Sequence, residues 1–321
     1  MRHLLCSLAL AAVMIPAAPA LASGGKIALT FDDLPALTVL KGQPYVDYLT
    51  TRLLRGLRLH HFRVIGFVNE GKLDTDRAAQ TANLERWLDA GMGLGNHTFA
   101  HSAASEVGAR AYIADITKGE PATRGLLAER HERLRWFRHP YLDTGSPAPV
   151  RHEIDTWLAE HGYRVAPVTI DAEDWEFAEP YDDAIARHDL IRQKRIRSEY
   201  LAYTAMRVAW SQESARILFG RDIAHVMLLH ATRLNADTIG DLARVFHRAH
   251  LQRTTLDDAL RDPAYQTRDS YTGKEGINWL ERWALTLHKE LPEHGDVDPP
   301  KNIEIEYDRV DNDRAGRKTG P

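Results

Sequence analysis

The chain has almost no cysteine. Among its 321 residues only Cys6 is present, and it lies in an N-terminal segment that we expect to be removed. A mature chain without cysteine holds no disulfide and performs no thiol chemistry. Cys6 also lies too early for a lipoprotein anchor, which needs a cysteine at the cleavage site. The mature protein is therefore expected to fold on its hydrophobic core alone.

An excess of either charge sign is absent as well. The chain has 41 Lys and Arg residues against 45 Asp and Glu residues, a formal net charge of −4. Nucleic-acid-binding domains usually carry a basic surface, so no nucleic-acid partner is expected. With 44% hydrophobic residues, the composition is typical of a soluble globular protein. We find no internal repeat and expect a monomer by default.

There is no long hydrophobic run. The apolar stretch 4–15 follows a basic start and is too short for a comfortable membrane span. It leads to the small-residue site Ala20-Leu21-Ala22. These features predict a secretory signal peptide over residues 1–22, hence a periplasmic or secreted protein without a membrane span after cleavage. The alternative is a buried core helix at the start of the chain.

From Lys26 onward, short apolar runs alternate with stretches of helical spacing. The apolar runs are 27–31, 64–68, 92–95, 134–137, 165–170 and 226–229. Helical spacing is clearest at 45–59 and 79–90. This alternation predicts an α/β fold whose parallel strands form a barrel or an open sheet.

The same patterns suggest how the chain is divided. We expect a catalytic domain over residues 23–262, with a helical insertion at about 176–222 that holds a pair of helices. A C-terminal extension over residues 263–321 loses the alternation. Its charged end, from Asp296 onward, is expected to be mobile.

Ionisable residues follow five of the apolar runs. They are Asp32 and Asp33 after the first run, His97 and His101 after the third, Arg138 after the fourth, Asp171 and Asp174 after the fifth, and His230 after the last. The C-terminal ends of parallel strands in β/α folds meet on one face, where catalytic groups gather. The sequence therefore predicts a functional face at the strand ends.

Each of these elements also has a simpler interpretation. An Asp-Asp pair after a strand often caps a helix or forms a turn. His97 and His101, four residues apart, would lie on one face of a helical turn, a spacing that suits a shared metal. Arg138 fits a structural ion pair, and Trp175 fits the core. His230 alone fits a hydrogen-bonded histidine near the surface.

Five segments together resemble the ordered motifs of the polysaccharide deacetylases, the enzymes with a NodB-like domain that form carbohydrate esterase family 4. The segments are Thr30-Phe31-Asp32-Asp33, His97-Thr98-Phe99-Ala100-His101, Arg138-His139-Pro140-Tyr141, Asp171-Ala172-Glu173-Asp174-Trp175 and Leu228-Leu229-His230. They occur in the family's order over residues 26–231. The resemblance implies a distorted (β/α) barrel with its active site in a groove at the strand C-termini. It also implies hydrolysis of acetyl groups on a polysaccharide or oligosaccharide.

The resemblance implies a metal site in the same place. Asp33, His97 and His101 would bind one divalent ion. Two imidazoles and a carboxylate leave coordination positions open for water and a carbonyl oxygen. Zinc is expected by availability, and cobalt, nickel, manganese or iron would suit the same ligands.

The resemblance also implies roles for residues that do not bind the metal. Asp32 would be the general base that takes a proton from the attacking water, and Arg138 would pair with it. The backbone N–H of Tyr141 would stabilise the oxyanion. His230 would protonate the departing amine, and Asp174 would orient His230.

Aromatic and apolar side chains would complete the substrate site. Trp175 and Leu228 would form walls around the acetyl methyl, with Tyr141 beside them. The C-terminal extension carries further rings, among them Trp279 and Trp283. These rings stack on sugars or cap the barrel, and we favour packing.

Three other functions fit parts of the pattern. Non-haem iron oxygenases also use two histidines and a carboxylate, although on an antiparallel jelly roll. An inactive carbohydrate-binding relative would share the fold, although no ligand, base or acid position is missing here. An O-acetyl esterase or another amidase would keep the chemistry and change the bond. Peptidoglycan, an exopolysaccharide, chitin-like oligomers and acetylated plant glycans all fit as substrates.

Overall fold

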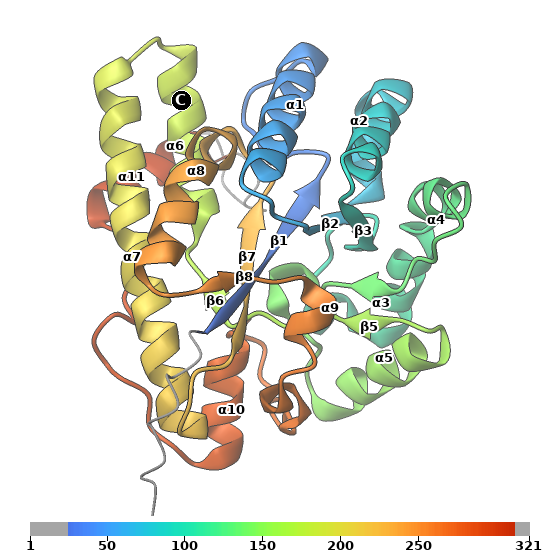
Figure 1. Cartoon of the computed structure of the whole chain (residues 1–321). Helices are drawn as coiled ribbons and strands as arrows, with labels where there is room; N and C mark the ends of the chain where they lie inside the picture. The colour runs from blue at the N-terminus through green and yellow to red at the C-terminus, as the bar shows by residue number, and fades with distance from the viewer. Residues whose placement is uncertain (1–24, 312–321) are drawn as a thin grey trace, which may run out of the picture.

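The computed structural model of the chain describes residues 25–311. The predicted signal peptide and the last residues of the C-terminal extension lie outside this range. Strands and helices alternate along most of the chain (Figure 1). The strands are β1 (Lys26–Leu34), β2 (Ile65–Val68), β3 (Gly93–Asn96), β4 (Trp136–Phe137), β5 (Arg164–Val165), β6 (Ile170–Asp171), β7 (Ala224–His230) and β8 (Gln252–Arg253).

Helices connect the strands and cover their outer side (Figure 1). The α-helices are α1 (Gln43–Leu59), α2 (Arg77–Asp89), α3 (Ala104–Lys118), α4 (Pro121–Ala128), α5 (Ala148–Glu160), α6 (Asp174–Ala186), α7 (Leu190–Phe219), α8 (Arg233–Arg248), α9 (Leu256–Ala259), α10 (Trp279–Leu287) and α11 (Lys301–Val310). Residues 25–311 also contain three short 3₁₀ helices, η1 (Glu70–Thr75), η2 (Pro140–Leu142) and η3 (Pro263–Gln266). None of the helices in the described range is long and apolar enough to cross a membrane.

The described strands form one 8-stranded sheet in the order β5-β4-β3-β2-β1-β7-β6, with β8 beside β1. Every strand pairing in it is parallel. Strand β1 lies in the middle, and all of its residues from Ile27 to Leu34 are buried. A strand covered on both faces reads as a continuous apolar run, which is why β1 was recognisable. The predicted α/β fold with parallel strands is confirmed.

The sheet is curled into a distorted barrel. Strands β5 and β6 stand at opposite ends of the sheet order, yet only residues 166–169 separate them in the sequence. So short a link joins two strands only if the edges of the sheet lie close together. The link is bonded to the strand next to each edge: Ala166 N donates to Phe137 O of β4 at 2.8 Å, and Thr169 N donates to Val226 O of β7 at 2.9 Å. The distorted barrel implied by the resemblance is therefore present.

The prediction of one strand over residues 165–170 is wrong. Ala166 and Val168 are fully buried, but they belong to the link that passes from one edge of the sheet to the other. An apolar run in a sequence indicates that its residues are buried, but it does not distinguish a buried link from a buried strand. The predicted run 134–137 likewise contributes only Trp136 and Phe137 to the sheet.

The side chains of β1 alternate between two cores. Ile27, Leu29 and Phe31 pack in the main core beneath the helices. Ala28 belongs to a second cluster, whose members come from several strands and therefore face one another inside the barrel. That inner cluster comprises Ala28, Phe67, Trp136, Ala166, Ala224, Val226, Leu256 and Ala259. The inner row of β1 continues toward its C-terminal end with Thr30 and Asp32, and this row leads to the candidate site.

Two long helices follow β6. Helix α7 begins after Asp189, whose side chain accepts a hydrogen bond from Arg192 N at 2.9 Å. It ends at Gly220, where a φ of 70° requires the left-handed conformation that glycine adopts without cost. Helices α6 and α7 pack against each other and against α8. The boundaries predicted for a helical insertion stay a prediction.

The C-terminal extension is more ordered than its charge indicates. Residues expected to be mobile include Lys301–Val310, which form α11 and pack on α6. Ile303 and Tyr307 are buried in this contact. The expectation of mobility is wrong for these residues, because an apolar residue every fourth position anchors an otherwise charged helix. Trp279 and Trp283 of α10 are also buried, which agrees with packing rather than sugar stacking.

Candidate active site

The end of β1 carries two adjacent carboxylates. In a regular strand neighbouring side chains point to opposite faces. Asp33, however, has a φ of 65°, a left-handed conformation that interrupts the alternation. Both carboxylates consequently reach one histidine: His97 Nε2 lies 3.8 Å from Asp32 Oδ2 and 3.9 Å from Asp33 Oδ1. Because both aspartates lie within β1, their interpretation as a helix cap or a turn is wrong.

Asp32 is held by a buried arginine from the loop after β4. Arg138 Nη1 lies 3.3 Å and 3.1 Å from the two carboxylate oxygens of Asp32. The same guanidinium donates to Thr30 Oγ1 at 2.9 Å and to Ala166 O at 2.8 Å, so it spans the barrel from β1 to the link. Burial raises the pKa of Asp32 to about 6, and Arg138 opposes that rise. Asp32 is thus an oriented carboxylate with increased basicity.

Asp33, His97 and His101 form a group that fits a divalent metal. One ligand atom from each residue lies within 4.8 Å of the others. Asp33 Oδ1 is 3.6 Å from His101 Nε2, and within the described residues this buried oxygen has no hydrogen-bond partner. A buried carboxylate oxygen without a donor is costly unless a cation occupies the position. The three residues therefore form a possible metal site with the usual nitrogen and oxygen ligands of zinc.

Backbone contacts orient the first histidine of this site. His97 Nδ1 donates to Arg138 O at 2.8 Å, which leaves Nε2 unprotonated and directed at the two aspartates. Burial lowers the pKa of His97 well below its ordinary value, so the ring is neutral. A neutral imidazole with a free Nε2 is the form that binds a metal.

The two histidines do not lie on a helical turn as the sequence spacing predicts. Residues 97–103 form a loop, and α3 begins only at Ala104. Thr98 and His101 have left-handed φ values of 64° and 57°, which are incompatible with a helix. Polar side chains close the loop instead: Thr98 N donates to Asn96 Oδ1 at 2.7 Å, and His101 N donates to Thr98 Oγ1 at 3.0 Å. The two rings still come together, with centroids 4.9 Å apart.

Sequence reasoning missed a lysine in this site. Lys72 Nζ, in η1, lies 3.3 Å from Asp33 Oδ2, on the oxygen opposite the histidines. Burial alone would raise the pKa of Asp33, but Lys72 and then His101 hold it far below its ordinary range. Asp33 is therefore ionised at all working pH values. The rule that strand ends deliver functional residues, applied also to β2, would have pointed to Lys72.

On the other side of Asp32 lies a histidine paired with an aspartate. His230 is the register partner of Asp32 across β1 and β7. Its Nδ1 donates to Asp174 Oδ1 at 2.7 Å, and its backbone N donates to Asp174 Oδ2 at 2.7 Å. Asn235, which the sequence did not indicate, donates to Asp174 Oδ2 and to His230 O. Burial lowers the pKa of His230, but Asp174 outweighs it and raises the pKa to about 9.

The Asp174–His230 pair leads to a prediction about pH. A general acid must be protonated, and a pKa of about 9 keeps His230 protonated at neutral pH. Asp174→Asn removes the charge that raises this pKa, so the alkaline limb of kcat/KM is expected to move down by at least about one pH unit. Asp182→Asn is the control, since this buried carboxylate of α6 bonds Thr38 and Tyr45 instead. Equal alkaline limbs in wild type and Asp174→Asn would contradict the role of the pair.

Tyr141 lies beside the possible metal site. Its ring centroid is 4.4 Å from that of His101, and 61% of the residue is exposed. Tyr141 and Leu142 have left-handed φ values of 56° and 53°. Two such residues in succession turn the chain sharply after Pro140. This places the ring of Tyr141 edge-on against the ring of His101.

Leu228 and Trp175, the two predicted apolar walls of the substrate site, lie in different surroundings. Leu228 lies in β7, pairs with Thr30 and Asp171 on the neighbouring strands, and is buried. Trp175, the second residue of α6, packs its ring against Tyr307 of α11 at a centroid distance of 4.9 Å. Their roles around an acetyl methyl stay predictions.

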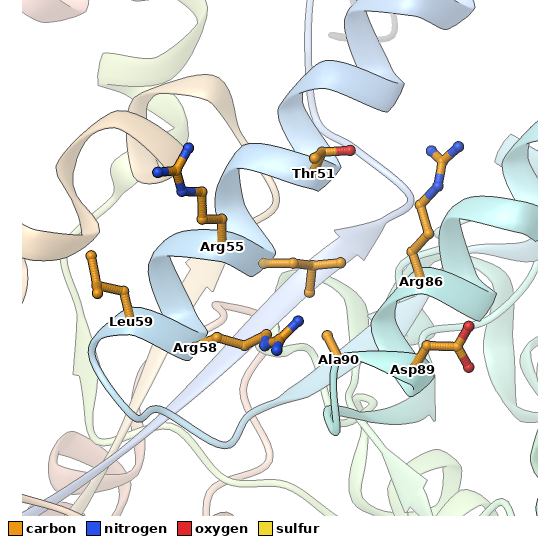
Figure 2. Close-up of a pocket in the computed structure, with 8 residues that line it drawn as sticks. Thr51, Arg55, Arg58, Leu59, Arg86, Asp89 and Ala90 are labelled. Carbon is orange, nitrogen blue, oxygen red and sulfur yellow. The ribbon is translucent and has the colours of Figure 1, made fainter.

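A separate surface hollow lies between α1 and α2. Figure 2 shows the residues that line it, among them Arg55 and Arg58 from α1 and Arg86 and Asp89 from α2. None of the residues that line it comes from the strand ends or belongs to the possible metal site. The strand ends, not this hollow, hold the chemically distinctive group of residues.

The fold and the site together define a class of protein. They combine a parallel α/β barrel with a possible Asp-His-His metal site at the strand ends. Beside that site lie an oriented carboxylate and a protonated imidazole, the groups required for metal-assisted hydrolysis.

A family comparison agrees with this class. Residues 22–166 match the family model of the polysaccharide deacetylases, so this part of the chain is similar to that family. The matched segment carries Asp32, Asp33, His97, His101 and Arg138. It ends before Asp174 and His230, which the structure nevertheless brings to the same site. No curated protein matches the chain.

Several solved structures are similar to this chain at low sequence identity. A family 4 carbohydrate esterase from Streptomyces lividans, in complex with acetate, is 20% identical with a TM-score of 0.47, covering 74% of this chain and 97% of that chain. A polysaccharide deacetylase from Bacillus cereus is 18% identical with a TM-score of 0.49, covering 72% and 91%. A family 4 pseudoenzyme from Bacillus anthracis is 15% identical with a TM-score of 0.48, covering 74% and 66%.

Proposed function

We propose that this chain is an exported, metal-dependent carbohydrate deacetylase that hydrolyses N-acetyl groups. The observation that carries the proposal is the convergence of three units at the strand ends. These are the Asp-His-His group, the Asp32–Arg138 pair and the His230–Asp174 pair. Each unit has a distinct protonation state, and hydrolysis of an amide needs all three. Export is inferred from residues 1–22, and a mature protein that retains Met1 would contradict it.

The possible metal site would supply electrophilic chemistry. Asp33, His97 and His101 would hold a divalent ion, most readily zinc, which would lower the pKa of a water molecule and polarise a carbonyl oxygen. Lys72 contacts the second oxygen of Asp33, so that the oxygen near both histidines is the one available as a ligand. The ligand geometry agrees with this use, because one ligand atom from each of the three residues lies within 4.8 Å of the others.

The residues around that site would move the protons. Asp32 accepts a proton from the water as its oxygen attacks the acetyl carbonyl carbon. Arg138 holds Asp32 in position, and the backbone N–H of Tyr141 donates a hydrogen bond to the oxyanion that develops. His230 then gives a proton to the sugar nitrogen as the carbon–nitrogen bond breaks. A free amine and acetic acid leave, and the acid loses the second proton of the water to solvent as it becomes acetate. Asp32 then releases its proton, and His230 takes one up, so that both groups return to their starting states.

Specific features of the site favour this function over its rivals. A non-haem iron oxygenase needs no separate base, whereas Asp32 is held apart by Arg138 with a pKa of about 6. All strand pairings are parallel, unlike a jelly roll. An inactive binding relative has no need of an imidazole whose pKa is raised to about 9. An O-acetyl ester needs little leaving-group protonation, so the strong His230–Asp174 pair favours the amide.

The test is acetate release by the mature protein. N-acetylated oligosaccharides of glucosamine and an O-acetylated xylan are compared, each with zinc-loaded enzyme and with enzyme treated with a chelator. We expect acetate from the N-acetylated substrates with the loaded enzyme, and a loss of at least about 100-fold on chelation. Equal acetate release with and without metal would contradict metal dependence. Release from the xylan alone would shift the proposal to an esterase.

A further inference from the structure

The turn that carries Tyr141 needs support from outside itself. Tyr141 and Leu142 are consecutive non-glycine residues in the left-handed conformation. Such residues are disfavoured and persist only where the surrounding structure fixes them. Within the turn, Leu142 N donates to His139 O at 3.1 Å, and Asp143 N donates to Pro140 O at 3.0 Å. Ser105 of α3 donates to Asp143 from its backbone N and its hydroxyl. Further support reaches Leu142 itself from a part of the chain more than a hundred residues away.

That support centres on Arg282 of α10. Its side chain is completely buried, and its Nη2 donates to Leu142 O at 2.6 Å. Its Nη1 donates to Thr144 Oγ1 at 3.0 Å, two residues further along the same loop. A charged donor on a backbone carbonyl in a buried setting makes a strong and directional contact. Arg282 therefore fixes the loop at two points, Leu142 and Thr144.

The backbone that precedes α10 lies against the same Tyr141–Leu142 turn. A Cβ atom built at Gly276 would lie 1.7 Å from Tyr141 O, so the backbone of Gly276 lies directly against that carbonyl. Only glycine permits this close approach. The next residue, Ile277, accepts a hydrogen bond from Arg282 Nε at 2.9 Å through its carbonyl oxygen. Gly276 and Arg282 thus hold Tyr141 and Leu142 from adjacent points of one segment.

This segment is itself anchored to the barrel. Trp279 N donates to Val168 O at 2.7 Å, in the link between β5 and β6. The guanidinium of Arg282 lies over the ring of Trp279, 4.5 Å from its centroid. Asp269 pairs with Arg282 at 3.2 Å and with Arg151 of α5 at 2.9 Å. The segment is therefore a rigid support rather than a loose appendage.

We propose that residues 269–283 form a catalytic brace, in which Arg282 is a positioning residue that holds the backbone N–H of Tyr141 where the oxyanion develops. The inference rests on the proposed deacetylase function. It assigns a role to part of the C-terminal extension, which lies outside the family match. Arg282 contacts no reacting atom, so it acts through the Tyr141–Leu142 turn.

The test separates positioning from stability. Arg282→Gln is expected to lower kcat by about 10- to 100-fold, which is less than the fall in kcat when an oxyanion donor is removed outright. The KM and the amount of bound metal should change by less than about threefold. Arg282→Lys is expected to restore part of kcat. Gly276→Ala displaces the same turn while keeping Arg282, and it should lower kcat without a large change in KM. This second variant keeps the test valid if Arg282→Gln folds poorly.

A matched control is available in the same extension. Lys289 donates to the carbonyl oxygens of Ile217 and Leu218 at 2.7 Å and 2.8 Å, away from the turn. Lys289→Gln should lower the Tm and leave kcat unchanged. An active wild type whose Arg282→Gln and Gly276→Ala variants keep kcat within twofold would overturn the brace alone. A metal-loaded wild type that releases no acetate would overturn the proposed function, and the brace with it.

Discussion

Replacing Asp32 by asparagine is expected to lower kcat by about three orders of magnitude, within the range that loss of a general base produces. The amide keeps the shape of the side chain but cannot take a proton from water. The structure isolates this effect, because Asp32 contacts Arg138 while Asp33 contacts Lys72 and lies with the histidines. Acetate release by protein that is folded and loaded with zinc is the measurement.

Two controls make this result specific to the base. Metal content must stay near one ion per chain in Asp32→Asn. Asp33→Asn makes the same chemical change at the adjacent residue, and this variant should lose the metal. Arg138 keeps its bonds to Thr30 and Ala166, so the site is not expected to collapse. A kcat within tenfold of wild type in folded, metal-loaded Asp32→Asn would show that another group is the base.

The fold was largely predictable from the sequence because β1, β2 and β7 are buried on both faces. Their apolar runs end at the residues that the structure brings together, including Asp32 and His230, which are register partners. The closure of the barrel was less predictable, since residues 166–169 are apolar and buried without belonging to a strand. Burial is visible in a sequence, but the direction that the backbone takes is not.

The site was predictable in its residue types and less so in its local geometry. The four-residue spacing of His97 and His101 suggested a helical turn, yet hydrogen bonds that the Asn96 and Thr98 side chains accept from backbone N–H groups stabilise a loop instead. Polar side chains that bond to nearby backbone compete with a helix in this way. Lys72 was missed because the strand-end rule was not applied to the segment that follows β2.

The brace formed by residues 269–283 was beyond sequence reasoning for a different reason. Its contacts with the Tyr141–Leu142 turn join residues more than a hundred positions apart. Nothing in the local sequence of Arg282 distinguishes it from a surface arginine on a helix. The structure shows that Arg282 is completely buried, with its guanidinium over the rings of Tyr271 and Trp279 and paired with Asp269.

The prediction with the second large effect concerns the metal itself. His97→Ala removes the histidine whose Nε2 is directed at both aspartates by the bond from its Nδ1 to Arg138 O. The remaining Asp33 and His101 are too few for tight binding of zinc. We expect the variant to lose its metal and, with it, acetate release. His152→Ala is the matched control, because this exposed histidine lies on α5.

The most direct test of the account is therefore the metal content of the purified mature protein. Wild type, His97→Ala and His152→Ala are loaded with zinc, freed of excess ion and analysed by mass spectrometry for metal per chain. The account predicts about one zinc in wild type and in His152→Ala, and close to none in His97→Ala. A folded wild type without metal, or a His97→Ala variant that keeps its zinc, would contradict it.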